Sequence, residues 1–246
     1  MPIIIKLRPK SILMVLTYIS WRNNMKKIKT ILLPLSLLLS IPIINNIYGD
    51  LNNSARGVHY LVTYLDKKIP FISEFSIPYL MLYPFILFTL IYFCIYYRKV
   101  YFKVMSSIII GMVIFFIIYY MFQTSVPRPQ LYGNSFFTNL VKYIYINDNP
   151  FNCFPSTHVF MSYLMIKGIK DTKKEVTFEK VFITTISIAI ILSTQFIKQH
   201  VILDMIFAIL LGEGIYRLVN HISLEGSLLW IKKLFWWLMT KKKLEI

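Results

Sequence analysis

Residues 104–124 read VMSSIIIGMVIFFIIYYMFQT, an apolar stretch that contains no charged side chain. A transmembrane α-helix needs about 20 consecutive, mostly apolar residues. The stretch therefore predicts a membrane-spanning helix, and hydropathy predicts comparable helices elsewhere, about six in all. We expect an all-α fold, a polytopic membrane helical bundle of about six transmembrane helices. Their expected ranges are 30–48, 76–97, 104–124, 155–170, 180–198 and 200–219.

The composition is that of an integral membrane protein. Hydrophobic residues make up 57% of the chain and charged residues only 15%, whereas a soluble domain carries about 25% charged residues. The net charge of +16 could suit nucleic acid. However, the basic residues flank apolar spans, where they set topology and contact anionic lipid. We therefore expect the lipid bilayer, and no nucleic acid, as a partner, while the oligomeric state stays open.

The charge pattern divides the chain into three parts. Residues 1–27 form a basic N-terminal extension, residues 28–219 form the six-helix membrane domain, and residues 220–246 form an interfacial tail of basic and aromatic residues. Within the extension, residues 1–24 read either as an interfacial segment or as an over-long gene start with Met25 as the initiator. The length of the chain leaves no room for a second large domain.

Basic loops alternate with loops that are poor in excess basic charge. By the positive-inside rule, this alternation places both termini in the cytoplasm. Three polar segments, 127–129, 155–158 and 193–204, then lie together on the extracytoplasmic side. Because the topology does not depend on these segments, their agreement predicts a single site, which we expect in the cytoplasmic membrane of a bacterium. Segments 56–70 and 136–147 are expected to lie on the membrane surface as amphipathic stretches.

His200 and Asp204 are four residues apart, which on a helix places them on one face, about 6 Å apart along the axis. A carboxylate there can accept a hydrogen bond from one imidazole nitrogen and leave the other as a nucleophile. Asp204 lies in an apolar run, where an ionisable residue is usually functional. Both are candidate catalytic residues, although a solvated pair at a helix end would show the same spacing.

A second set of residues has the character needed to bind phosphate. Ser156 or Thr157 follows a proline and can cap a helix, whose free N-terminal amides suit an anion. His158 is placed to protonate a leaving alkoxide. Arg128, between two prolines, and Lys198 can supply positive charge to phosphate oxygens. The alternative interpretation is an ordinary helix cap with interfacial histidine and snorkelling basic residues.

A metal site is the competing interpretation of the same segments. His158, His200 and Asp204 could bind zinc as a catalytic set of three ligands. Arg128 and Lys198 argue against it, since neighbouring cations would repel the metal. We therefore expect no metal and no cofactor.

These segments resemble the three motifs of the type 2 phosphatidic acid phosphatase (PAP2) superfamily, which run Lys-x6-Arg-Pro, Pro-Ser-Gly-His and Ser-Arg-x5-His-x3-Asp. The resemblance covers roughly residues 76–219 and implies the six-helix fold of that family. The matching residues are Arg128-Pro129, Pro155-Ser156-Thr157-His158, and Ser193, His200 and Asp204.

The chain departs from the PAP2 motifs at two cationic positions. Met121 stands where the first motif has lysine, and Thr194 stands where the third has arginine. Lys198-Gln199-His200 resembles instead a variant found in the inositol phosphorylceramide synthase-like branch. Gln199, Ser193 and Thr194 are accordingly candidate accessory residues of the site.

The resemblance implies a phosphohistidine route on a membrane lipid phosphate. His200 attacks phosphorus, Asp204 orients His200, and His158 protonates the leaving group. The phosphoryl oxygens are held by Arg128, Lys198, Ser156 and Thr157. The implied function is an integral membrane lipid-phosphate phosphatase that hydrolyses phosphomonoesters or diphosphates. The alternatives are a phospholipid-headgroup phosphotransferase and a non-catalytic lipid-binding membrane protein.

Overall fold

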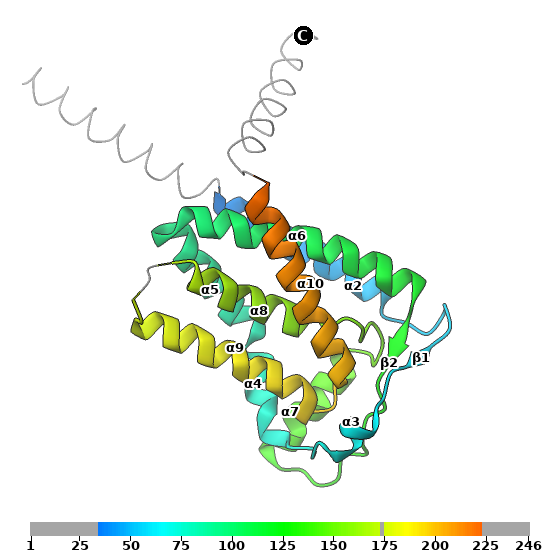
Figure 1. Cartoon of the computed structure of the whole chain (residues 1–246). Helices are drawn as coiled ribbons and strands as arrows, with labels where there is room; N and C mark the ends of the chain where they lie inside the picture. The colour runs from blue at the N-terminus through cyan, green and yellow to red at the C-terminus, as the bar shows by residue number, and fades with distance from the viewer. Residues whose placement is uncertain (1–33, 173–174, 223–246) are drawn as a thin grey trace, which may run out of the picture. The chain divides into compact units, whose positions relative to one another are not determined.

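The computed structural model describes residues 34–172 and 175–222 and is mostly helical (Figure 1). The described residues from Pro42 onward form one compact unit. Residues 34–41 belong to a second unit, whose described part holds a single-turn 3₁₀ helix and the first residues of α2. The elements are η1 Ser36–Leu39, α2 Ser40–Leu51, β1 His59–Tyr60, α3 Tyr64–Lys68, η2 Ser73–Phe75, α4 Ser76–Leu80, α5 Leu82–Tyr96, α6 Arg98–Met121, β2 Thr124–Ser125, α7 Phe136–Asn147, α8 Thr157–Lys170, α9 Phe178–Phe196 and α10 Ile202–His221.

Three of the described helical segments are long and apolar enough to cross a membrane: Ser73–Tyr96, Arg98–Met121 and Phe178–Phe196. Helix α8 has only 14 residues, and α10 carries three charged side chains along its length. The all-α class and the membrane character are therefore supported, and six spans remain a prediction. The predicted extension, residues 1–27, lies outside the described residues, as do residues 28–33 of the predicted membrane domain and residues 223–246 of the predicted tail.

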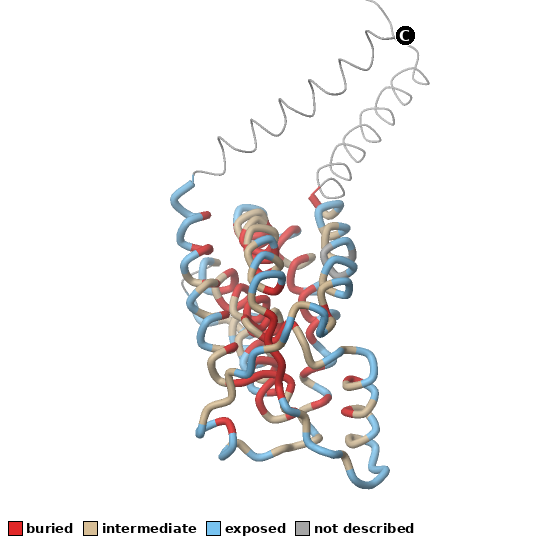
Figure 2. The backbone as a smooth tube through the Cα atoms, turned by 90° about the vertical axis from the view of Figure 1, so that its right-hand side faces the viewer, coloured by how far each residue is buried: buried red, intermediate tan, exposed pale blue. Residues whose placement is uncertain are grey.

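Helix α8 occupies the middle of the bundle and packs against α5, α6, α9 and α10 (Figure 1). Figure 2 shows the buried residues gathered around this centre. Two glycines allow the close approach of neighbouring helices. A Cβ atom added at Gly111 would lie 2.1 Å from the Phe160 ring, and one added at Gly168 would lie 2.7 Å from the Phe93 ring. Because interiors are close-packed, larger residues at these positions would force the helices apart.

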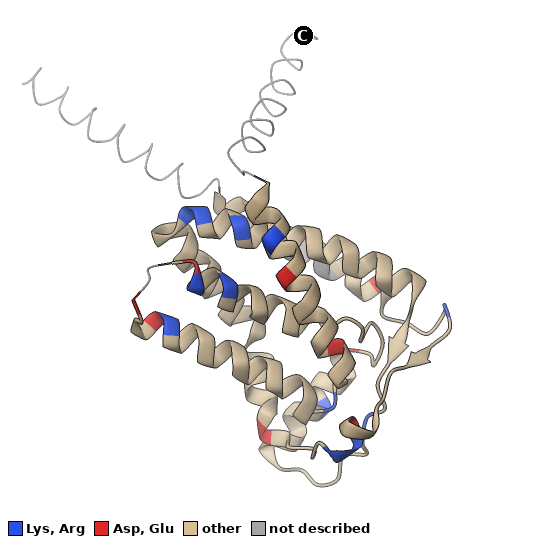
Figure 3. Cartoon of the chain, viewed as in Figure 1, with Lys and Arg blue, Asp and Glu red and all other residues tan. Residues whose placement is uncertain are grey.

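Helix α6 begins at Arg98, six residues before the predicted start at 104. The sequence prediction was wrong here because it assigned the basic residues to a loop, although arginine and lysine are good helix formers. The ammonium of Lys103 lies 2.6 Å from the carboxylate of Asp171, which follows α8, and Tyr216 of α10 donates to the same carboxylate at 2.8 Å. Figure 3 shows basic residues gathered at this end of α6, α8 and α9.

Segment 56–70, which was predicted to be an amphipathic stretch, is not helical throughout. Its helical part is α3 alone, and its earlier part forms β1, which pairs in parallel with β2. The cause is local: Thr63 caps α3 with a reciprocal capping box to Asp66, which starts a new helix at Tyr64. Segment 136–147, by contrast, coincides with α7, which buries Val141 and Ile144 and leaves other apolar side chains exposed.

Candidate active site

The predicted site segments converge at one end of the bundle, where α6 and α9 end and α8 and α10 begin (Figure 1). The backbone amide of Ser156 donates to the carbonyl of Asp204 at 3.3 Å, which joins the starts of α8 and α10. The rings of His158 and His200 lie 6.1 Å apart between centroids. The two histidines, 42 positions apart in the sequence, therefore face one small region.

The hydrogen bonds of His200 define its tautomer. Its Nδ1 lies 3.0 Å from the carbonyl oxygen of Cys153 and 3.3 Å from Oδ2 of Asp204. A carbonyl oxygen can only accept, so Nδ1 carries the proton and donates to both oxygens. The lone pair of the neutral ring is then on Nε2. The arrangement therefore holds the ring, which is 8% exposed, with a nucleophilic nitrogen opposite the carboxylate.

Asp204 is fully buried in the first turn of α10. Its Oδ2 accepts from the backbone amide of Val201 at 2.9 Å as well as from His200. That bond fixes the carboxylate at the positive end of the helix, where a negative charge is favoured. Asp204 is thus held by its own helix in a position that orients His200. His200 itself lies before α10, so the contact does not arise from two residues on one helical face as predicted.

His158 lies in the first turn of α8, whose N-cap is Ser156. The Ser156 hydroxyl accepts from the amide of Val159 at 3.4 Å, so Ser156 acts as a cap and its side chain is engaged within the helix. The His158 ring stacks on Tyr79 with centroids 4.1 Å apart. Its buried Nδ1 has no hydrogen-bond partner among the described residues. The ring is therefore held by packing against Tyr79, and its Nδ1 takes no part in holding it.

Arg128 lines the same cavity as His200 and is tied to protein groups. It donates to the carbonyls of Tyr145 and Asp148 at 3.0 and 2.7 Å and to Oε1 of Gln199 at 2.5 Å. Its guanidinium also lies 4.3 Å from the Tyr145 ring centroid. These contacts hold the cation next to the residue that precedes His200. Gln199, predicted as an accessory residue, therefore links Arg128 to the loop that carries His200.

Lys198 occupies the position just after the C-cap of α9, with a left-handed φ of 54°. Its ammonium donates to the carbonyls of Asp66 and Ile69 at 2.9 and 2.6 Å. Partial burial lowers the pKa of this lysine. In this structure Lys198 holds the α3 segment against the loop that carries His200.

Ser193 and Thr194 serve the end of α9. Their hydroxyls donate to the carbonyls of Ile190 and Ile191 at 2.6 and 2.7 Å. The carbonyl of Thr194 accepts from the amides of Gln199 and His200 at 3.0 and 3.1 Å. Both side chains are thus engaged with the helix backbone. Thr194 is one of the two positions at which the chain departs from the PAP2 motifs, and Met121, the other, is 77% exposed.

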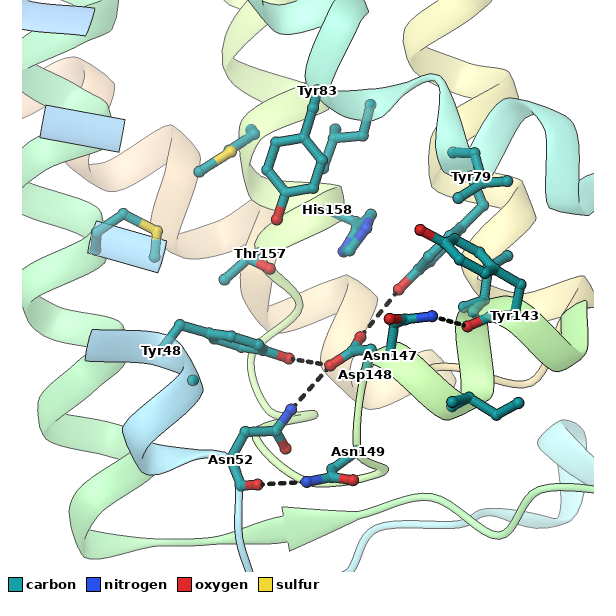
Figure 4. Close-up of a pocket in the computed structure, with 17 residues that line it drawn as sticks. Tyr48, Asn52, Tyr79, Tyr83, Tyr143, Asn147, Asp148, Asn149, Thr157 and His158 are labelled. Carbon is teal, nitrogen blue, oxygen red and sulfur yellow. Dashed lines mark hydrogen bonds between the residues drawn. The ribbon is translucent and has the colours of Figure 1, made fainter. Parts of the chain in front are cut away.

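Two cavities flank the pair of histidines. One, of about 400 Å³, has His200, Arg128, Lys198 and Lys67 and the carboxylate of Asp66 in its lining, and we call it the cationic cavity. The other, of about 440 Å³, is lined by His158 and Thr157 together with tyrosine and asparagine side chains and Asp148 (Figure 4). We call it the hydroxyl cavity. The histidines therefore stand between a space that suits an anion and a space that suits polar, uncharged groups.

Three residues that the structure places at the site were not among the predicted site residues. Asp66 accepts from the amide of Ile202 at 2.7 Å, so its carboxylate supports the first residue of α10. Asp148 accepts from Tyr48 at 3.1 Å and from Asn52 at 2.8 Å. Tyr79 stacks on His158. For the two aspartates, composition was an available signal, because the whole chain has only 11 acidic residues.

The comparisons with known proteins give no family for this chain. No protein-family model, no curated protein and no solved structure matches it. Among the described residues, no group of three His, Cys, Asp or Glu is placed to hold a metal ion. What the chain does must therefore be argued from its motifs and from the geometry of this site.

Proposed function

We propose that the protein is an integral membrane lipid-phosphate phosphatase of the PAP2 type that works through a phosphohistidine intermediate. The observation that carries the proposal is the hydrogen bonding of His200, which puts its proton on Nδ1 and its lone pair on Nε2. A neutral, oriented imidazole is the form that attacks phosphorus. The cationic cavity beside it, with Arg128 and Lys198, supplies the charge that attracts a phosphate.

In the first step, Nε2 of His200 bonds to phosphorus while the bond from phosphorus to the leaving oxygen breaks. His158 gives its proton to that oxygen, and Asp204 stabilises the positive charge that develops on His200. His158 is buried beside a second imidazole, which disfavours its charged form, and the bound phosphate supplies the negative charge that favours it. In the second step, His158 takes a proton from water as the water oxygen attacks phosphorus and releases His200.

The role of the cations follows from their contacts. Arg128 donates to three oxygens of the protein, so it is held in position before the substrate binds. A bound phosphate would replace the weaker of these contacts. Lys198 is held by two carbonyls at the rim of the cationic cavity. The free amides at the start of α8, next to Thr157, add further donors.

A phosphotransferase is the second candidate, and the hydroxyl cavity favours it. The cavity opens onto His158 and has the volume to admit an alcohol of moderate size. If such an alcohol replaces water in the second step, the phosphoryl group is transferred instead of hydrolysed. In both cases the first step and the roles of the two histidines are the same.

The proposal is tested by purifying the protein and presenting a panel of lipid phosphates in mixed micelles. Free phosphate and new phospholipid are scored together, so hydrolysis and transfer are both detected. We expect turnover in the native protein and loss of turnover in His200→Ala, with His221→Ala as the control, because His221 lies at the other end of α10. If both variants match the native protein, or the native protein turns over no member of the panel, a non-catalytic lipid-binding role is supported instead.

A further inference from the structure

The hydroxyl cavity differs in charge from the cationic cavity on the other side of the histidines. Of the described residues that line it, none is a lysine or an arginine. Asp148 is its single carboxylate, and the remaining polar lining consists of tyrosine, asparagine, threonine and His158. A phosphate therefore has its counter-charges on the His200 side, and the His158 side offers only hydrogen-bonding and apolar groups.

The Asp148 carboxylate is fixed at the inner wall of this cavity (Figure 4). Tyr48 and Asn52 of the α2 segment donate to Oδ1, and the Tyr79 hydroxyl lies 3.5 Å from Oδ2. The same Tyr79 stacks on His158. One tyrosine ring thus lies between the carboxylate and the histidine that would protonate the leaving group.

The leaving group must occupy the space next to its proton donor. In the proposed reaction that donor is His158, so the leaving group lies in the hydroxyl cavity while phosphorus is attacked from the His200 side. An alcohol suits this cavity, because amide, hydroxyl and tyrosine groups can hydrogen-bond it and the adjoining Met112, Met161 and Leu82 can contact its apolar part. An anionic leaving group would meet a carboxylate, and no lysine or arginine among the described lining residues would pair with it, which is unfavourable in a space of low dielectric constant.

We infer that Asp148 is a specificity-determining residue, which makes the enzyme select phosphate esters of uncharged alcohols and reject substrates whose leaving group is itself an anion. This inference rests on the proposed function, and it narrows the substrate class to lipid monophosphates. Diphosphates are disfavoured, because their leaving group retains a phosphate.

The test compares farnesyl phosphate with farnesyl diphosphate in detergent micelles. The two probes share one apolar chain, and their leaving groups are an uncharged alcohol and a phosphate anion. Loss of each substrate is followed, so hydrolysis and transfer both count. The quantity of interest is the ratio of kcat/KM for the monophosphate to kcat/KM for the diphosphate. The two substrates differ in intrinsic reactivity, and this difference cancels when the ratio is compared between variants.

We expect Asp148→Asn to lower this ratio about tenfold or more, because the amide keeps an acceptor oxygen but removes the negative charge. Asn147→Lys, a change at an exposed residue that lines the same cavity, adds a positive charge and should lower the ratio in the same direction. It also keeps the test decisive if Asp148→Asn does not fold. Asp50→Asn removes the same charge from an exposed position of α2 outside the cavity lining and should leave the ratio unchanged.

The two proposals fail in different ways. If the native protein consumes neither probe, the proposed phosphatase or phosphotransferase function is contradicted. If it consumes a probe but the folded Asp148→Asn and Asn147→Lys variants keep the native ratio, the function stands and the role of Asp148 is overturned.

Discussion

At the scale of single residues, the two histidines occupy different environments and should fail in different ways when they are replaced. His200 is oriented by a carboxylate and a carbonyl oxygen, whereas His158 is held by stacking on Tyr79. The first environment suits a nucleophile and the second a proton donor whose charge depends on bound substrate. The chemistry assigned to each residue therefore follows from its contacts.

The variant His158→Ala should lose about 10²–10⁴-fold in rate on a lipid phosphate, the usual contribution of general acid catalysis. A nitrophenyl phosphate needs little protonation of its leaving group, so it should partly rescue this variant and should not rescue His200→Ala. Steady-state rates on both substrates measure the difference. Equal rescue of the two variants would mean that the roles are assigned wrongly.

Asp148 should make stability depend on pH. Burial raises its pKa, and nearby Arg128 opposes that rise only in part. The folded state then binds this proton more tightly than the unfolded state, so Asp148 destabilises the fold progressively as pH rises from the unfolded pKa through the raised folded value. Asp148→Asn should therefore improve thermal stability, relative to the native protein, more at pH 7 than at pH 4. Asp50→Asn is the control, and the same relative change at both pH values would contradict the prediction.

At the scale of elements, the junction between α9 and α10 determines where His200 stands. Lys198 adopts the left-handed conformation just after the end of α9, where glycine is the usual residue. The Lys198 ammonium donates to the carbonyl of Asp66, and the Asp66 carboxylate accepts from the amide of Ile202. The α3 segment is therefore bound to both the end of α9 and the start of α10. A strained residue is thus kept in place by contacts with a separate part of the chain.

Lys198→Gly and Lys198→Ala remove the same hydrogen bonds, but only glycine relieves the backbone. The glycine variant should therefore be the more stable of the two by about 1 kcal/mol, which corresponds to a melting temperature about 2–4 °C higher for a chain of this size. Thermal unfolding of both variants in one detergent measures this difference. Equal melting temperatures would show that the backbone at 198 is not strained.

At the scale of the whole molecule, the sequence predicted the positions of the helices better than it predicted which residues of other helices surround the site. Apolar runs located α9 and α10 to within two residues at each end, because length and hydropathy are local properties. The contact of His200 with Asp204 was expected from their spacing on one helix, but His200 lies before α10 and meets Asp204 at the start of that helix. The positions of Asp148 and Tyr79 at the site depend on long-range contacts, in which Asp148 meets Tyr48 of α2 and Tyr79 of α4 stacks on His158 of α8, and no local pattern in the chain encodes these contacts.

The charge around the site also predicts independence from metal ions. Positive charge near the phosphate is supplied by Arg128 and Lys198, which line the cationic cavity. Turnover should therefore survive excess EDTA. Loss of turnover on chelation, followed by recovery on addition of zinc, would favour the metal interpretation of the His158, His200 and Asp204 set.

The most direct measurement is rapid-quench trapping of the phosphorylated protein with a ³²P-labelled lipid phosphate. The native protein should form an acid-labile phosphohistidine, located by peptide mapping to His200. Asp204→Asn should form it more slowly, because the imidazole remains but is poorly oriented, and His200→Ala should form none. A phosphorylated protein that persists in His200→Ala, or an acid-stable phosphoserine in the native protein, would contradict the nucleophilic role of His200.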